Sequence, residues 1–143
     1  MISSRPTRRD SLLFVYGTLR PFVDIAMAQW LRRSARYIGP ALTRGRLYDL
    51  GPYPAMTRAR DRREHVVGDV YRLASPRVFR VLDGYEAGPV RSKARFVRER
   101  CVVKLERGRC RAAWTYRYRY GVVGVAQIES GDYRAHCRRT SAR

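Results

Sequence analysis

An apolar stretch that ends abruptly at a glycine, residues 11–20 (SLLFVYGTLR), constrains the fold of this chain more than any other feature. Residues 12–16 are apolar or aromatic and predict a buried strand. Gly17 and Thr18 then begin a turn, where glycine allows a close approach of the backbone to a neighbour or a positive φ. Free backbone N–H groups in such a turn can hold a carboxylate or a developing oxyanion. From the residues alone, an ordinary strand-to-turn connection is the alternative.

The length of the chain limits it to one domain with a single core. It has 143 residues, 45% of them hydrophobic, which excludes a disordered chain. We expect residues 11–136 to form the domain, with a flexible basic segment at 1–10 and a basic tail at 137–143. No apolar run reaches the ~20 residues of a membrane-spanning helix, and none is typical of a signal sequence. No membrane partner is therefore expected.

Basic residues far outnumber acidic ones. The chain carries 31 lysines and arginines against 12 aspartates and glutamates, a formal net charge of +19. Its only lysines are Lys93 and Lys104, so the excess is almost entirely arginine. A charge of this size attracts nucleic acid and other polyanions, and we expect weak nonspecific polyanion binding. The charge bears on partners more than on fold.

Cysteine and histidine are too scattered to predict a metal site. Cys101, Cys110 and Cys137 form no C-x-x-C pair, and His65 and His136 stand apart from them. This spacing argues against zinc, and an odd number of cysteines argues against a disulfide framework. A reduced, cytoplasmic protein is the expectation.

Two short helices are predicted. The first spans residues 25–35, with Asp24 as its cap and Gly39-Pro40 as the stop after it. The second begins at Ser75-Pro76, where a capping hydroxyl precedes a proline at the first helical position. The side chains expected on the buried face of the second helix are Val78, Val81, Leu82 and Tyr85.

Strands account for most of the remaining chain. Residues 41–60 are strand-like but interrupted by the turn Gly51-Pro52, and residues 65–73 alternate as one strand. Many strands with two short helices indicate a mixed α+β domain.

Residues 95–105 and 110–120 predict a hairpin around Arg107-Gly108. If Leu105 pairs with Cys110, one face of the hairpin is the core face and the other is cationic. The core face would carry Val97, Glu99, Cys101, Val103, Ala112, Trp114, Tyr116 and Tyr118. The cationic face would carry Arg98, Arg100, Lys104, Arg111, Arg117 and Arg119.

Four motifs give the chain a resemblance to a known family. They are Tyr16-Gly17-Thr18-Leu19-Arg20, residues 45–50 (GRLYDL) with Tyr53-Pro54-Ala55, residues 82–86 (LDGYE), and residues 130–133 (SGDY). In this order they resemble the γ-glutamylcyclotransferase-like superfamily, with its γ-glutamylamine cyclotransferase and AIG2-like members and its YGTLR signature. The resemblance covers residues 12–134. It implies an α+β fold, a small closed mixed β-barrel flanked by short helices.

Glu86 is the catalytic acid/base that the resemblance implies, since it matches the glutamate of the family's LD-x-x-E-G-like segment. Its place at the end of the second predicted helix lets it point into a cleft, where partial burial raises a carboxyl pKa toward neutrality. Ala87 stands where the family often has glycine. The rival carboxylates are Glu99, on the core face of the hairpin, and Asp83, which a core-facing helix directs away from Glu86.

The turn after the first strand is the substrate-binding element that the resemblance implies. After Arg20 the family usually continues with proline and glycine, whereas Pro21 is followed here by Phe22, which reshapes the mouth beside the turn. Tyr53 and Tyr118 are predicted aromatics of the cleft, with core or rim packing as the alternative. The residues expected to hold the γ-glutamyl group are Tyr16, Gly17, Thr18 and Leu19.

The resemblance implies a cyclotransferase that needs no metal or organic cofactor. Its small-molecule substrate is a γ-glutamyl amine or γ-glutamyl amino acid, which attack within one molecule converts to 5-oxoproline and a free amine. The alternative is a non-catalytic binding module on the same fold, whose arginine-rich surface recruits an anionic partner such as nucleic acid. The predicted hairpin separates its arginines from its tyrosines, and this separation favours the enzyme.

Overall fold

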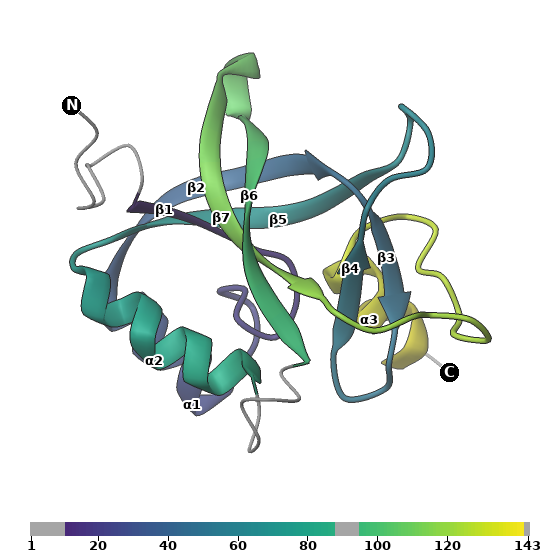
Figure 1. Ribbon diagram of the computed structural model, residues 1–143, viewed down its shortest axis with the longest axis horizontal. Helices are drawn as coiled ribbons and strands as arrows, with labels where there is room; N and C mark the ends of the chain where they lie inside the picture. The colour runs from purple at the N-terminus through teal and green to yellow at the C-terminus, as the bar shows by residue number, and fades with distance from the viewer. Residues whose placement is uncertain (1–10, 88–94, 142–143) are drawn as a thin grey trace.

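The computed structural model describes residues 11–87 and 95–141 (Figure 1). The predicted flexible segment 1–10, the pair Gly88-Pro89 and residues 142–143 lie outside the described residues. No helix of the described chain is long and apolar enough to cross a membrane. The elements are β1 (Leu12–Val15), α1 (Ala26–Ser34), β2 (Ala35–Arg44), β3 (Arg46–Asp49), β4 (Pro54–Thr57), β5 (His65–Leu73), α2 (Pro76–Ala87), β6 (Phe96–Leu105), the 3-10 turn η3 (Glu106–Gly108), β7 (Cys110–Tyr118) and α3 (Tyr133–Ser141).

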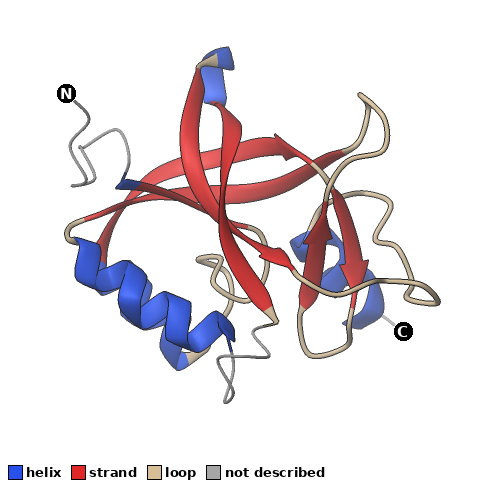
Figure 2. Cartoon of the chain, viewed as in Figure 1, coloured by secondary structure: helices blue, strands red, loops and turns tan. Residues whose placement is uncertain are grey.

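Five strands close into a barrel in the order β1-β5-β2-β6-β7. Its pairs are antiparallel except β1 and β7, which run parallel, so the barrel is mixed. β3 and β4 form a separate two-stranded sheet. Helices α1 and α2 lie on one side of the barrel, and α3 lies near the β3–β4 sheet (Figures 1 and 2). The predicted class, an α+β fold with a small mixed barrel and short flanking helices, is confirmed.

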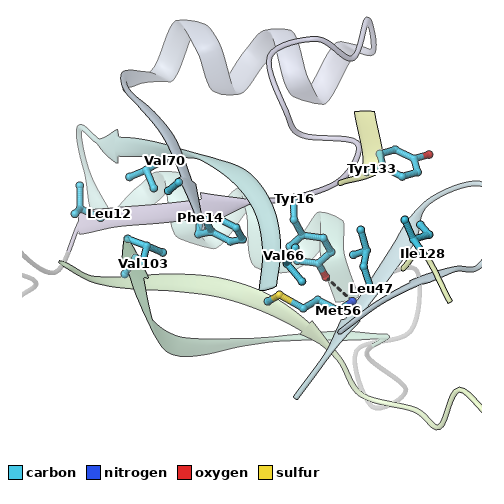
Figure 3. Packing of buried hydrophobic residues seen from close by; sticks show 12 residues of the cluster. Leu12, Phe14, Tyr16, Leu47, Met56, Val66, Val70, Val103, Ile128 and Tyr133 are labelled. Atoms are coloured by element: carbon cyan, nitrogen blue, oxygen red, sulfur yellow. Dashed lines mark hydrogen bonds between the residues drawn. The ribbon is translucent and has the colours of Figure 1, made fainter. Parts of the chain in front are cut away.

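The continuous apolar sequence of β1 follows from its burial on both faces. Alternate residues of a strand point to opposite sides. Leu12 and Phe14 therefore join one core cluster, which extends to the β3–β4 sheet (Figure 3). Leu13 and Val15 join a second cluster with Leu31 of α1 and the buried residues of α2. β1 thus connects the two halves of the core, and the turn that follows it starts from a rigid base.

The first helix is shorter than predicted, and a strand follows it directly. Ile25 occupies the N-cap position of α1 without a side-chain cap, whereas Asp24 accepts a hydrogen bond from Gln29. The prediction that Gly39-Pro40 ends a helix is wrong. This pair lies inside β2, which begins at Ala35, at an irregularity in its pairing with β5. A bulge in a strand can accommodate a proline. The same glycine–proline pair is also typical of the end of a helix, so the two cases look alike in sequence.

The second helix begins as predicted, but its buried face is rotated. The Ser75 Oγ accepts a hydrogen bond from the backbone N–H of Arg77 (3.1 Å). Val81 and Tyr85 were expected in the core but are exposed, because the helix turns its Phe79 side toward Trp114 of β7 (ring centroids 6.2 Å apart). The buried residues of α2 are Val78, Phe79 and Leu82.

The hairpin β6–β7 forms with a register one residue away from the predicted one. The last pair of the ladder is Lys104 with Cys110, and the N–H of Leu105 donates to the carbonyl of Arg109 (2.7 Å). The loop is therefore one residue longer on the β6 side than the pairing of Leu105 with Cys110 assumed. A slip of one residue moves each side chain of one strand opposite a different set on the other. The predicted core and cationic faces are therefore wrong.

The corrected register places arginines and aromatic residues together. Arg98 lies opposite Tyr116, and Arg100 lies opposite Trp114. The Arg98 guanidinium is 4.9 Å from the Trp114 ring centroid, and that of Arg100 is 4.6 Å from it. Such distances are typical of cation–π contacts. The predicted separation of hairpin arginines from aromatic rings does not hold at these positions.

The SGDY motif at residues 130–133 builds the start of α3. Gly131 has a φ of +69°, and a Cβ there would lie 2.0 Å from the carbonyl oxygen of His65, so only glycine fits. Asp132 then caps the helix, because its Oδ1 accepts hydrogen bonds from the N–H groups of Arg134 (3.0 Å) and Ala135 (3.4 Å).

α3 extends into the segment predicted as a tail. It ends at Ser141, so residues 137–141 are helical, and Cys137 packs against the first core cluster. His136 of the same helix lies 2.8 Å from the Asp49 carboxylate at the end of β3. These contacts fix α3 to the β3–β4 sheet.

Candidate functional site

A small cavity opens where the ends of β1 and α2 meet the starts of β4 and β6. Its volume is about 140 Å³. Pockets for drug-sized ligands begin near ~300 Å³, so this cavity suits a group of amino-acid size. The lining residues are Phe14, Val15, Tyr16, Gly17, Thr18, Leu19, Tyr53, Pro54, Tyr85, Glu86, Arg95, Phe96 and Tyr116.

Glu86 contributes the carboxyl group of the cavity. It lies in the last turn of α2 and is partly buried. Burial raises the pKa of Glu86 from 4.5 to about 7, against the opposing charge of Arg95. A carboxyl group that titrates near neutral pH can both accept and return a proton, as a general acid/base must. The cavity therefore contains a group suited to proton transfer.

The turn after β1 supplies another part of the cavity wall. The N–H of Arg20 donates to the carbonyl of Gly17 (3.1 Å) and closes the turn. Within residues 11–87 and 95–141, the backbone N–H groups of Gly17, Thr18 and Leu19 have no hydrogen-bond acceptor. Such fixed donors can bind a carboxylate or an oxyanion.

Gly17 is required by close packing and not by an unusual φ. A Cβ at this position would lie 2.7 Å from Cγ and 2.8 Å from Cδ of Pro54. Both distances are shorter than a normal contact between carbon atoms. The turn and the start of β4 are therefore in direct contact, and together they shape the cavity.

Gly17→Ala is expected to destabilise the fold by about 1–3 kcal/mol, because a rigid proline ring must move to admit the methyl group. The matched control is Gly84→Ala, in the interior of α2, where an added Cβ meets nothing within 4 Å. The control should be neutral or slightly stabilising. Thermal unfolding of both variants provides the measurement, and equal unfolding temperatures would contradict the close contact.

Tyr16 lines the cavity, but its hydroxyl group already has partners in the protein. The hydroxyl donates to the carbonyl of Tyr116 (2.5 Å) and accepts from the N–H of Met56 (3.3 Å), the bond drawn in Figure 3. Burial raises the pKa of Tyr16, so the phenol stays neutral. Tyr16 thus ties β1 to β7 and β4, and its ring forms part of the cavity wall.

Asp83 is connected to the cavity through a tyrosine. The Tyr116 hydroxyl, on the cavity wall, donates to Asp83 Oδ1 (2.5 Å). Arg98 Nε lies 3.3 Å from the same oxygen. The three side chains form a chain from α2 through the β6–β7 hairpin, and they fix the Tyr116 ring beside Glu86. Asp83 itself does not line the cavity, in agreement with the sequence prediction.

The two predicted cleft aromatics have different positions. Tyr53 lines the cavity, whereas Tyr118 lies in a separate groove and packs on Phe96 with ring centroids 5.3 Å apart. The rival carboxylate Glu99 also lines this second groove, where it pairs with Arg117 (2.6 Å). Glu99 was expected beside Tyr116, whereas the corrected register places it opposite Thr115.

Several lining residues were not predicted from the sequence. Arg95 directly precedes β6, Phe96 is the first residue of that strand, and Tyr116 follows from the corrected register. Tyr85 precedes Glu86 in α2 and was assigned to the core. The pairing of Phe96 with Tyr118 could not be derived without the loop length, so the sequence contained no local signal for these positions.

Metal ligands do not gather in the described chain. Within residues 11–87 and 95–141, no group of three histidine, cysteine, aspartate or glutamate side chains lies together. The cysteines Cys101, Cys110 and Cys137 form no disulfide with one another.

Comparisons with solved structures identify the fold. Similar structures include YkqA of Bacillus subtilis (24% identity, TM-score 0.73), an AIG2-like protein of Mus musculus (21%, 0.66) and PH0828 of Pyrococcus horikoshii (17%, 0.63). They match 94%, 83% and 94% of this chain, and 43%, 86% and 98% of their own lengths. The chain thus spans less than half of YkqA. No curated protein matches the sequence.

The family follows from a match of the sequence to a family model. The family model described as "Gamma-glutamyl cyclotransferase, AIG2-like" matches residues 13–135, most of the chain. This match includes the turn after β1, Glu86 and the start of α3. The protein therefore belongs to the AIG2-like γ-glutamyl cyclotransferase family.

Proposed function

We propose that the protein is a cyclotransferase that converts a γ-glutamyl amine or γ-glutamyl amino acid to 5-oxoproline and a free amine. One observation carries this proposal. Glu86, with its pKa near 7, and the donor turn at residues 17–19 line the same cavity of amino-acid size. Family membership supports the same reaction class.

Glu86 moves the proton in the proposed reaction. Its carboxylate takes a proton from the α-ammonium group of the substrate, and the freed amine attacks the γ-carbonyl carbon. A new C–N bond closes the five-membered ring and leaves a tetrahedral oxyanion. The bond to the leaving amine then breaks as the Glu86 carboxyl group returns the proton to that nitrogen. The ring nitrogen is still cationic at this point, so it gives its second surplus proton to the regenerated Glu86 carboxylate, which passes it to the departed amine. The products are 5-oxoproline and a protonated amine, so atoms and charge balance.

The rest of the cavity holds the reacting conformer. Attack within one molecule gains its rate from proximity, so the enzyme mainly selects the conformer in which the amine faces the γ-carbonyl. The N–H groups of Gly17, Thr18 and Leu19 are proposed to bind the substrate and its oxyanion. One well-placed donor of this kind contributes roughly 3 kcal/mol to the transition state.

The test is formation of 5-oxoproline by the purified protein. The donors are γ-glutamyl amino acids, γ-glutamyl-ε-lysine and γ-glutamyl alkylamides, and α-glutamyl peptides are the matched control because their geometry cannot close the same ring. We expect 5-oxoproline from at least one γ-glutamyl donor and none from the α-linked controls. No product from any γ-glutamyl donor would overturn the proposal.

A second candidate function is polyanion binding at the groove that contains Tyr118. This groove has a volume of about 700 Å³ and is lined by the β6–β7 hairpin, the segment after β4 and residues 119–123. Basic and aromatic side chains, the pair that binds single-stranded nucleic acid, line it together. They are Arg58, Arg60, Arg117, Arg119, Tyr48, Tyr118 and Tyr120, with Glu99 as an opposing charge.

Arg58→Gln with Arg60→Gln tests this second function, because both side chains are exposed in the groove. If the groove binds a single-stranded oligonucleotide, the slope of log affinity against log salt should fall by about 1–2. Arg77→Gln with Arg80→Gln, on the exposed side of α2, removes the same charge and should change the slope less. Fluorescence anisotropy across a salt series measures both. Equal effects would show binding by net charge alone.

A further inference from the structure

Arg95 is held in place at the mouth of the cavity. Its Nη1 donates to the Tyr53 hydroxyl (2.8 Å), and its guanidinium lies 5.5 Å from the centroid of the Tyr53 ring. Tyr53 in turn packs edge-on against Phe96 (ring centroids 5.5 Å apart). The Arg95 carbonyl accepts a hydrogen bond from the N–H of Arg119 (2.8 Å). Backbone and side chain are both anchored, so the guanidinium has a defined position although it is exposed.

The Arg95 guanidinium has no carboxylate partner in the described chain. No aspartate or glutamate of residues 11–87 and 95–141 lies within ion-pair distance of it. By contrast, Arg20, Arg98 and Arg117 each pair with a carboxylate. A guanidinium has five N–H donors in a planar fork that matches a carboxylate. Among the described residues, only the Tyr53 hydroxyl accepts a hydrogen bond from this guanidinium, so a fork of donors remains for a ligand.

The position of Arg95 indicates which part of a substrate it meets. The cavity suits a group the size of the γ-glutamyl unit, and Glu86 and the donor turn line it. With the γ-glutamyl unit inside the cavity, the leaving amine would extend from the γ-carbonyl toward the exposed Arg95 side chain. We propose that Arg95 binds a carboxylate on the leaving amine, so that the enzyme prefers γ-glutamyl amino acids to γ-glutamyl amines without a carboxylate. This inference rests on the proposed cyclotransferase function.

The substrate has a second carboxylate that Arg95 could bind, the α-carboxylate of the γ-glutamyl unit. The two sources make different predictions, since every substrate carries the α-carboxylate but only some leaving amines carry a second one. The donor turn already offers the N–H groups of Gly17, Thr18 and Leu19 to the γ-glutamyl unit. Arg95 is therefore assigned to the leaving group.

The experiment compares γ-glutamylalanine with γ-glutamylethylamide, which differ by the carboxylate of the leaving group. The parent should prefer γ-glutamylalanine in kcat/KM by about tenfold, a typical value for one charge-assisted hydrogen bond at an exposed site. Arg95→Gln should reduce the ratio to near one, and Arg95→Lys should retain part of it. Tyr53→Phe, which removes the hydroxyl that orients Arg95, should reduce the ratio partly. Arg77→Gln, with the same loss of charge on α2, should keep it.

The ratio of the two kcat/KM values separates binding of the leaving-group carboxylate by Arg95 from the electrostatic effect of Arg95 on Glu86. Loss of the Arg95 charge raises the pKa of Glu86 and changes the rate with both substrates equally, so the effect cancels in the ratio. An equal fall with both substrates would leave the ratio at its parent value, which would show that Arg95 does not bind the leaving group and would overturn the inference. Equal kcat/KM values in the parent would overturn it while leaving the cyclotransferase intact. Absence of 5-oxoproline from both substrates, and from the wider donor panel, would overturn the proposed function and this inference with it.

Discussion

Glu86→Gln should lower 5-oxoproline formation by a factor of about 10²–10⁴, the usual contribution of a positioned acid/base. Glutamine preserves the size of the side chain but cannot accept the proton of the substrate ammonium group. The parent should show a rise in kcat/KM with an apparent pKa of about 7, as the Glu86 carboxyl ionises. The variant should lose this rise. Initial rates from pH 5 to 9 provide the measurement.

We also predict the direction in which Glu86→Gln changes the stability of the folded protein. The pKa of Glu86 in the folded protein is raised from 4.5 to about 7 by burial, so the folded state prefers the neutral form. This preference contributes stability that is fully present below pH 4.5 and is lost as the pH rises through 7. Glu86→Gln removes the ionisation, so the variant should be at least as stable as the parent at pH 8. A normal unfolding temperature then shows that lost turnover is not lost folding.

Glu99→Gln is the matched control for the loss of a glutamate. Glu99 lies in the second groove and pairs with Arg117, so the control should keep turnover close to that of the parent. If Glu99→Gln loses turnover and Glu86→Gln retains it, the assignment of the general acid/base is wrong.

Arg20→Met should cost about 3–5 kcal/mol in the free energy of unfolding, because it breaks a buried ion pair. Arg20 Nε donates to Asp69 (2.8 Å), and the exposed fractions of the two side chains are 7% and 8%. Arg20 Nη1 also donates to Asp132 (2.9 Å), the cap of α3. Removal of the guanidinium leaves the Asp69 carboxylate buried, with the Tyr37 hydroxyl (2.6 Å) as its one remaining side-chain partner among the described residues. Urea unfolding at pH 7 measures the loss.

The control for this change is an exposed arginine. Arg58 is 80% exposed, and its contact with Glu99 is 3.8 Å long, so Arg58→Met should change stability by less than about 0.5 kcal/mol. A double variant, Arg20→Met with Asp69→Asn, should lose less than the sum of the single losses, since the second change removes the unpaired charge. A loss below about 1 kcal/mol in Arg20→Met would contradict the structural role given to the end of the YGTLR motif.

The contacts of Arg20 could not be predicted from the motif in which it lies. The sequence presents Arg20 as one more basic residue after a turn. The fold shows that it joins the turn to β5 and to α3, whose residues lie far away in sequence. Its effect on the cavity is to hold the turn that carries Gly17, Thr18 and Leu19.

Several features followed from the sequence because they depend on near neighbours. The apolar run before Gly17 predicted a buried strand, Ser75-Pro76 predicted the start of α2, and Glu86 was predicted at the end of that helix. Strand formation, helix capping and turn formation are decided mainly by residues within a few positions of one another. The order of the motifs also predicted the family, and the family predicted the barrel.

Tertiary structure alone decided how distant segments meet. The loop between β6 and β7 set the register, which placed Thr115 opposite Glu99, Arg98 opposite Tyr116 and Phe96 opposite Tyr118. Packing of α2 on Trp114 buried Phe79 where Val81 was expected. Alternation tells which residues of a strand share a side, but the register between strands depends on loop geometry and on the fit of the whole core. For this reason the sequence by itself determined Glu86, the turn and Tyr53 as site candidates, whereas the fold determined that Arg95 joins Tyr53 at the mouth.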